Sequence, residues 1–175
     1  MTRFAAHRPV SGVVRLPYGG LKETHMKYSF RPSTEADFEF VFQLNETNTR
    51  KYVEVLRGWD DKAERAEMRR QFQPGADQII MIDGNDADVL GVNHYPTKID
   101  LRHIEILPEY QGRGITTATV REIVEEVRQA NIPVTLMVLN MNPAKELYEG
   151  LGFRVLEEVD TGRTGVKYRM TTAAP

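Results

Sequence analysis

The segment from Gln111 to Thr116 has a composition that suits the binding of an anion. Gly112 and Gly114 flank Arg113, at the point where an extended segment ending at Pro108 gives way to an amphipathic helix. Free N–H groups and the dipole at a helix start attract phosphate, and glycines let a ligand approach the backbone. An arginine adds a permanent charge that can hold phosphate in fork geometry. The segment predicts a phosphate cradle, although two glycines at such a junction also suit a plain tight turn.

Two better-known phosphate motifs do not fit this segment. No Gly-Lys-Ser or Gly-Lys-Thr follows the glycines, which argues against a nucleoside triphosphate. The three-glycine fingerprint of dinucleotide-binding proteins is also missing. An unrelated nucleotide-binding α/β protein is therefore the weaker alternative.

Periodicity and breaker residues predict the elements that must position this junction. We expect strands over residues 28–31, 78–82, 89–95, 99–107, 134–139, 153–159 and 166–170, and helices over about 33–47, 60–72, 114–129 and 142–151. The strand 134–139 is a nearly continuous apolar run, as in a sheet that is covered on both faces. This order predicts an α+β or α/β sandwich with a mixed sheet.

The apolar residues of the strand 99–107 change parity partway along it. They are Ile99, Leu101, Ile104 and Ile106. A bulge near Arg102 and His103 would produce this shift.

Length and composition limit the kinds of protein that this chain can be. Its 175 residues, 41% of them hydrophobic, suit one domain, which we expect over residues 26–175 after a flexible extension, 1–25. That extension is basic and acid-poor like a transit peptide, but its prolines and glycines break any amphipathic helix and it lacks the apolar stretch of a signal peptide. A cytoplasmic protein is the expectation.

Charge and residue counts favour a small ligand. The net charge of -2 gives no overall reason to bind nucleic acid or an anionic membrane, and the apolar runs are too short to span a bilayer. Without cysteine the chain has no disulfide, no thiolate nucleophile and no cysteine zinc site. The histidines show no metal-ligand spacing, so no metal is expected; they are His7, His25, His94 and His103.

Two motifs together resemble those of the GNAT N-acetyltransferase superfamily. The first is Ile106-Leu107-Pro108-Glu109-Tyr110-Gln111-Gly112-Arg113-Gly114-Ile115, similar to the family's Gln/Arg-x-x-Gly-x-Gly/Ala stretch. The second is Asn142-Pro143-Ala144-Lys145-Glu146-Leu147-Tyr148-Glu149-Gly150-Leu151-Gly152-Phe153, similar to the family's Asn-x-Ala-x-x-Leu-Tyr helix. Arg31, Pro32 and Asp37 are also typical, so the resemblance covers about residues 27–171. It implies a mixed, mostly antiparallel sheet of about seven strands with helices on both faces.

The resemblance also implies a cofactor and a set of binding residues. The acyl donor would be acetyl-coenzyme A, with backbone N–H groups near Ile106 and Leu107 polarising the thioester carbonyl. The implied contacts to coenzyme A are Ile106, Leu107, Gln111, Gly112, Arg113, Gly114, Ile115, Thr116, Asn142 and Ala144. Thr116 departs from the family's usual Gly or Ala, so its hydroxyl either bonds a phosphate or weakens binding.

The resemblance assigns Tyr148 as the acid that protonates the departing thiolate, although the helix pattern alone favours a core tyrosine. The base that accepts the proton of the amine stays open between Glu105 and His103, since burial can raise the pKa of a carboxyl and histidine titrates near neutrality. For the acceptor side, the candidates are Tyr52, Arg57, Trp59, Asp60 and the loop 160–165.

These assignments predict an enzyme that moves an acetyl group to a primary amine by direct attack in a ternary complex. The alternative is a module that binds coenzyme A without catalysis, as a sensor or interaction partner. The acceptor stays open among a small amine, an amino acid, an antibiotic and a protein amine. Many members of the family dimerise, so a homodimer is compatible with the resemblance.

Overall fold

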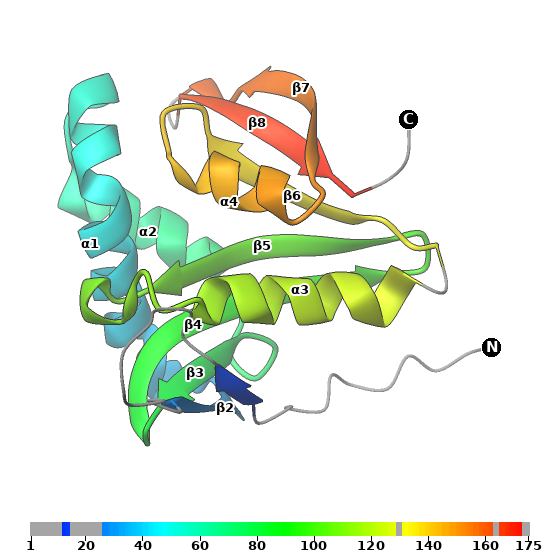
Figure 1. Cartoon of the computed structure of the whole chain (residues 1–175). Coiled ribbons are helices and arrows are strands. Elements are labelled where there is room, and N and C mark those ends of the chain that lie inside the picture. Colours follow the sequence, from blue (N-terminus) through cyan, green and yellow to red (C-terminus); the bar gives the residue numbers. More distant parts are fainter. Residues whose placement is uncertain (1–11, 15–25, 129–130, 163–164, 173–175) are drawn as a thin grey trace.

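The computed structural model describes residues 12–14, 26–128, 131–162 and 165–172, and these residues build a single eight-stranded sheet flanked by helices (Figure 1). The helices are η1 (Glu35–Asp37), α1 (Phe38–Arg57), α2 (Asp61–Gln71), η2 (Pro108–Tyr110), α3 (Ile115–Arg128) and α4 (Ala144–Gly150). The strands are β1 (Gly12–Val14), β2 (Met26–Pro32), β3 (Gln78–Ile82), β4 (Asn85–Tyr95), β5 (Lys98–Ile106), β6 (Val134–Leu139), β7 (Arg154–Asp160) and β8 (Val166–Thr171).

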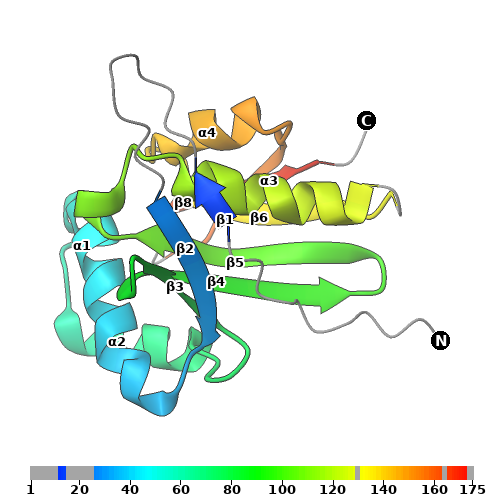
Figure 2. The same cartoon turned by 60° about the horizontal axis from the view of Figure 1, so that its bottom comes forward.

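The strand order is β1-β2-β3-β4-β5-β6-β8-β7, and every described neighbouring pair is antiparallel except β5 and β6. Helices α3 and α4 cover one face of the sheet, and α1 and α2 cover the other (Figures 1 and 2). The predicted mixed, mostly antiparallel sheet with helices on both faces is confirmed. None of the described helices is long and apolar enough to cross a membrane.

Neighbouring residues of the central strands supply the two faces, as strand geometry requires. Ile80 and Leu90 belong to the larger buried cluster, together with Val120 of α3. The adjacent Ile79 and Val89 belong to a second cluster with α1 and α2. The central strands β3 and β4 are thus buried on both sides. In β6, Val134, Leu136 and Val138 are buried but Met137 is exposed, so its apolar residues do not reflect cover on both faces.

The first helix differs from the prediction. We expected it to end near Thr47, but α1 continues to Arg57 and ends at Gly58, whose φ is +76°. Residues 45–51 are all polar, so the apolar stripe is interrupted there. No proline or glycine interrupts the segment, and Arg50 forms i,i+4 ion pairs with Glu46 (2.5 Å) and Glu54 (3.6 Å).

The first 25 residues lie largely outside the described part of the chain. Within them Gly12–Val14 forms β1, which pairs antiparallel with β2 and adds an edge strand that we did not predict. The other predicted elements are present with ends shifted by a few residues, and β3 and β6 have the predicted bounds.

The predicted bulge in β5 is confirmed. His103 pairs with Gly91 and Leu101 pairs with Val92, so Arg102 is the extra residue. Ile104 therefore joins the larger core cluster that also contains Leu101. A side chain at position 91 would place its Cβ 2.6 Å from His103 Nε2, so the close approach requires glycine there.

The GNAT-like residues Arg31 and Asp37 form an ion pair at 2.7 Å that ties the end of β2 to the start of the first helical segment. Asp37 also accepts the Thr34 N–H at 2.7 Å. The guanidinium of Arg31 is the main reason that the pKa of Asp37 lies below its usual range. This part of the resemblance is a structural element that joins β2 to η1.

Candidate functional site

Strands β5 and β6 separate after a short paired region. They pair only from Ile99 with Val134 to Leu101 with Leu136. Beyond this point β5 continues to Ile106, whereas β6 stays paired with β8 as far as Leu139. The two strands thus leave an opening in the middle of the sheet, next to the start of α3.

A cavity of about 650 Å³ occupies this opening. It is lined by parts of α1, β5, the 111–117 turn, β6 and α4, and by Lys167 of β8. All but one of the residues implied by the resemblance line it: His103, Glu105, Ile106, Gln111, Gly112, Arg113, Gly114, Ile115, Thr116, Asn142, Ala144 and Tyr148. The exception is Leu107.

The turn before α3 presents backbone N–H groups to this cavity. Gly112 and Gly114 have φ values of +71° and +77°, a region that favours glycine, and nothing lies within 4 Å of a Cβ built on Gly112. Within the described part of the chain, Gln111 N–H donates to Pro108 and Ala118 N–H donates to Gly114, but no hydrogen bond is described for the N–H groups of Gly112, Gly114, Ile115 and Thr116. The Arg113 guanidinium lies 5.4 Å from the Tyr110 ring centroid.

Ile106 and Leu107 expose their backbones to opposite sides. The Leu107 N–H faces β4, where it donates to Ala87 O at 2.9 Å, and its side chain packs on the second core cluster. The Ile106 carbonyl faces the opening, where it accepts from Asn48 Nδ2 (3.2 Å) and Gln111 Nε2 (3.1 Å). In an antiparallel strand the N–H and C=O of one residue point to the same side, so Ile106 N–H faces the opening as well. Of the two backbone N–H groups that the resemblance implies as donors to the thioester, only that of Ile106 faces the opening.

Glu105 combines burial with an unsatisfied oxygen. Its Oε1 accepts from Asn45 Nδ2 of α1 at 2.8 Å, whereas its buried Oε2 has no hydrogen-bond partner in the described residues. Burial raises the pKa of Glu105 to about 7, against the opposing effect of the Asn45 hydrogen bond. A carboxylate with this pKa can accept a proton near neutrality.

His103 has a different environment on the same strand. It packs over Gly91, and its Nε2 lies 3.8 Å from Asp77 Oδ1. Burial lowers the pKa of His103 to about 4, with Asp77 opposing and Arg102 reinforcing the shift. The imidazole is therefore neutral at pH 7 and a weaker base than the Glu105 carboxylate.

Tyr148 lies on α4 with 8% of its surface exposed, in edge-to-face contact with Phe153 at 5.7 Å between ring centroids. Burial, followed by the charges of Asp88 and Glu105, raises the pKa of Tyr148 to about 12. No described residue hydrogen-bonds its hydroxyl, although the residue lines the cavity. The tyrosine is thus both a core residue and a residue of the cavity wall.

Asp88 is a fully buried carboxyl that sequence reasoning did not single out. Its Oδ1 accepts the Glu105 N–H at 3.0 Å, and its Oδ2 has no partner in the described residues. Burial raises the pKa of Asp88 well above its usual value. Asp88 thus holds the β5 backbone at Glu105, the residue whose carboxyl has the raised pKa.

The start of α4 is organised by Asn142. Its Oδ1 accepts the Ala144 N–H at 2.9 Å, and its carbonyl accepts the Lys145 N–H at 3.2 Å. The asparagine in the second motif therefore fixes the first turn of the helix that carries Tyr148.

Two cavity residues of α1 escaped the sequence analysis: Asn45 lies near the end of the predicted helix, and Asn48 lies just beyond it. Asn45 and Asn48 donate to Glu105 and to the Ile106 carbonyl. With Thr49 and Tyr52 they line the cavity at positions 45, 48, 49 and 52, a polar stripe at helical spacing. That spacing is the signal that could have revealed both the longer helix and its role.

Most of the predicted acceptor residues have structural roles instead. Only Tyr52 lines the cavity. Arg57 forms an ion pair with Glu64 at 2.6 Å, Trp59 packs on the second core cluster, and Asp60 caps α2 by accepting Ala63 N–H. In the loop 160–165, residues 163 and 164 lie outside the described part of the chain, and its described residues do not line the cavity.

Residues 45–172 match the sequence model of the acetyltransferase (GNAT) domain. The chain belongs to the GNAT acetyltransferase family. The match covers the cradle, β5, β6 and α4, which are the elements that surround the cavity. A comparison with curated proteins finds no match.

Solved GNAT structures share this fold at low sequence identity. The PaiA N-acetyltransferase of Thermoplasma acidophilum, in complex with coenzyme A, has a TM-score of 0.62 at 15% identity over 84% of this chain and 99% of that one. The ribosomal-protein-S18-alanine N-acetyltransferase of Escherichia coli has a TM-score of 0.59 at 16% identity over 85% and 96%. An N-acetyltransferase of Staphylococcus aureus has a TM-score of 0.62 at 11% identity over 81% and 98%. Identities this low carry the fold alone.

Proposed function

We propose that this chain transfers an acetyl group from acetyl-coenzyme A to a primary amine, which attacks directly within a ternary complex. One observation carries the proposal. Backbone N–H groups without a described protein partner open, at the start of α3, onto the same cavity as Glu105 and Tyr148. A diphosphate donor bound there would extend toward two groups that can move protons.

The residues present suit coenzyme A, which would be a substrate carrier here. The N–H groups of Gly112, Gly114 and Thr116 surround a turn that is open at Gly112, and Arg113 lies in the same wall. Such a turn holds phosphate oxygens by backbone donors, helix dipole and charge. The cavity volume of about 650 Å³ is in the range typical of ligand sites. The PaiA N-acetyltransferase, which has the same fold, was solved in complex with coenzyme A, and this supports coenzyme A as the ligand.

Ile106 would polarise the thioester carbonyl. Its N–H faces the opening beside β6, so it can stabilise the oxyanion that forms when the amine attacks. Removing one such preorganised donor typically costs about 3 kcal/mol of transition-state stabilisation. The side chains of Asn48 and Gln111 occupy the neighbouring Ile106 carbonyl, so they would rearrange if that carbonyl accepts a bond from the pantetheine arm.

Glu105 would accept the proton of the amine. As the nitrogen forms its bond to the acyl carbon, that proton moves to the unsatisfied Oε2 of Glu105. The carbon–sulfur bond then breaks, and Tyr148 gives its proton to the departing thiolate. The products are an amide and free coenzyme A, and proton transfer from Glu105 to Tyr148 through solvent restores both groups.

The two proton transfers support each other electrostatically. The charge of Glu105 is one of the factors that raise the pKa of Tyr148. When Glu105 takes up the proton of the amine this charge is neutralised, so Tyr148 becomes a stronger acid at the stage when thiolate leaves.

Release of coenzyme A thiol from acetyl-coenzyme A, measured across a panel of amines, tests the proposal. We expect at least one amine to increase thiol release, and coenzyme A at ~100 times its dissociation constant to stabilise the fold by about 2.7 kcal/mol. Stabilisation without turnover on any amine, and no effect of Tyr148→Phe, would identify a non-catalytic module instead. Stabilisation by ATP or NAD and none by coenzyme A would overturn the proposal altogether.

A further inference from the structure

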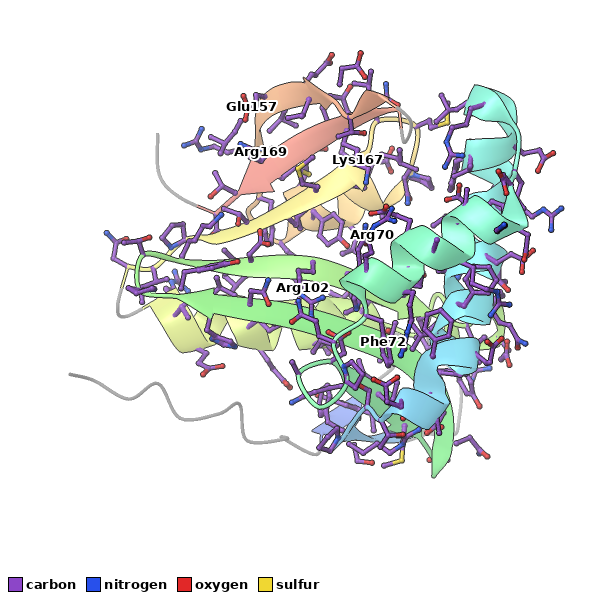
Figure 3. The ribbon with its side chains drawn as sticks, turned by 180° about the vertical axis from the view of Figure 1, so that it is seen from behind. Arg70, Phe72, Arg102, Glu157, Lys167 and Arg169 are labelled. Carbon is purple, nitrogen blue, oxygen red and sulfur yellow. The ribbon has the colours of Figure 1, made fainter. Side chains whose placement is uncertain are left out.

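Lys167 is a cationic residue of the cavity wall that the proposed chemistry does not use. It lies on β8, opposite Leu139 of β6, at the end of β6 that no longer pairs with β5. Its side chain is half-buried and lines the same cavity as Glu105. In Figure 3 it extends from β8 on the side of the sheet covered by α2.

The labelled cations around Lys167 in Figure 3 all have acidic partners. Arg169, two residues along the same strand face, pairs with Glu157 of β7 at 2.6 Å. Arg70 of α2 pairs with Glu67, and the bulge residue Arg102 pairs with the buried Asp77. The fold thus neutralises the charges that surround this part of the cavity.

Lys167 differs from them, because the described residues give it no ion pair and no hydrogen bond. The acidic group that acts on it is Glu67, whose two carboxylate oxygens already accept from Arg70 and Gln71. A half-buried ammonium without a partner is costly, and burial accordingly lowers the pKa of Lys167. Burial of this ammonium lowers the stability of the fold, and an anionic ligand that paired with it would offset this loss.

The part of the cavity around Glu105 and Lys167, where the acceptor would bind, is positive overall. Lys51 of α1 also lines it, with its ammonium 4.8 Å from the ring centroid of Tyr52. The acidic residue of the cavity wall is Glu105, whose raised pKa reduces its charge near neutrality. A polyamine would meet two ammonium groups here, whereas an anionic group would meet a complementary charge.

We propose that Lys167 binds a carboxylate of the acceptor, so that the amine substrate of this chain is an amino acid or another amine that carries a carboxylate. This inference rests on the proposed function. Glu105 on β5 and Lys167 on β8 lie on either side of the opening, and both line the cavity from the side of the sheet that α1 and α2 cover. The amine would lie near Glu105 while the carboxylate pairs with Lys167.

Matched acceptors give a direct test by thiol release from acetyl-coenzyme A. Glycine, β-alanine, 4-aminobutyrate and glutamate are each compared with their primary amides, which keep the shape but lose the charge. We expect kcat/KM to favour the best carboxylate by about tenfold or more over its amide, since a charged hydrogen bond in a partly buried site is strong. Lys167→Met, which keeps the apolar stem, should abolish this preference and raise KM, and Lys167→Arg should restore part of it.

The control is Lys98→Met, a lysine at the start of β5 that does not line the cavity. It should leave the preference unchanged. Lys167→Met should leave the melting temperature equal or raise it, because it removes a buried charge without a described partner. Equal use of carboxylates and amides, or a preference that survives Lys167→Met, overturns the inference while leaving acetyl transfer intact. If no amine is acetylated although coenzyme A binds, the proposed function fails and the inference fails with it.

Discussion

The cradle at the start of α3 offers backbone groups to the cavity, whereas the opposite wall around Glu105 offers side chains. The cradle consists of consecutive residues that line the cavity, and its proposed donors are backbone N–H groups around Gly112 and Gly114. The opposite wall consists of side chains from distant elements. Glu105 comes from β5, Asn45 from α1, Tyr148 from α4 and Lys167 from β8.

Under the proposed function, this difference separates binding of the donor from the proton transfers of the reaction. A backbone site depends on local conformation and tolerates most side-chain changes, whereas a side-chain site depends on individual groups. Changes in the opposite wall should therefore reduce turnover and leave coenzyme A binding intact. Changes in the cradle should do the reverse.

Glu105→Gln should have the largest effect on turnover. The amide cannot accept the proton of the amine, so we expect kcat to fall by about 10²–10⁴. In the unmodified chain kcat/KM should rise with pH and level off above about 7. The pKa of Glu105 is raised to about 7, so the carboxylate form that accepts the proton predominates only above that pH. The variant should lose this rise, and its stabilisation by coenzyme A should be unchanged.

His103→Gln is the matched control on the same strand. Because the imidazole is neutral and weakly basic, this change should lower kcat far less than Glu105→Gln does. A larger loss in the histidine variant would assign the base to His103.

Tyr148→Phe should rank second. The ring keeps its contact with Phe153, so the melting temperature should change little, but loss of the proton donor should lower kcat roughly 10²-fold. The loss should shrink with acyl donors whose leaving thiol is more acidic, since these need less protonation. A uniform loss across donors would contradict the role of acid.

Gly112→Ala tests the cradle side. With φ at +71° an alanine is strained by about 1–2 kcal/mol, and the turn should shift away from its phosphate-binding conformation. We expect the dissociation constant of coenzyme A to rise about tenfold while kcat at saturation is nearly unchanged.

Gly84→Ala is its control, since Gly84 has φ +87°, open space around a built Cβ and a place in the β3–β4 turn. It should lower the melting temperature similarly and leave coenzyme A binding intact. Equal weakening of binding by both changes would mean that strain alone, and not the cradle, is responsible.

Thr116→Val should have the smallest effect. Thr116 lies in the cavity wall within the first turn of α3. If its hydroxyl bonds a phosphate oxygen, the isosteric valine should weaken coenzyme A binding by about 1 kcal/mol, or roughly fivefold. Calorimetric titration would measure this change, and tighter binding would show that the hydroxyl hinders the ligand.

Local signals in the sequence were sufficient to locate the turn before α3 and much of the fold. Glycine spacing and the amphipathic pattern located the strand-to-helix junction, and the parity change in β5 located the bulge at Arg102. They failed at α1, where polarity suggested an end to the helix. The polar residues there line a cavity, and only the packing of α1 beside β5 makes this apparent.

The sequence by itself determined most of the elements and the position of the glycine turn before α3, because these depend on residues close together in the chain. The contrast between Glu105 and His103 was decided by the tertiary structure. Both residues lie on one strand, but Asn45 of α1 contacts the first, and Asp77, just before β3, lies beside the second. Burial and neighbouring charge set a pKa, and these neighbours come from distant parts of the chain that only folding brings together.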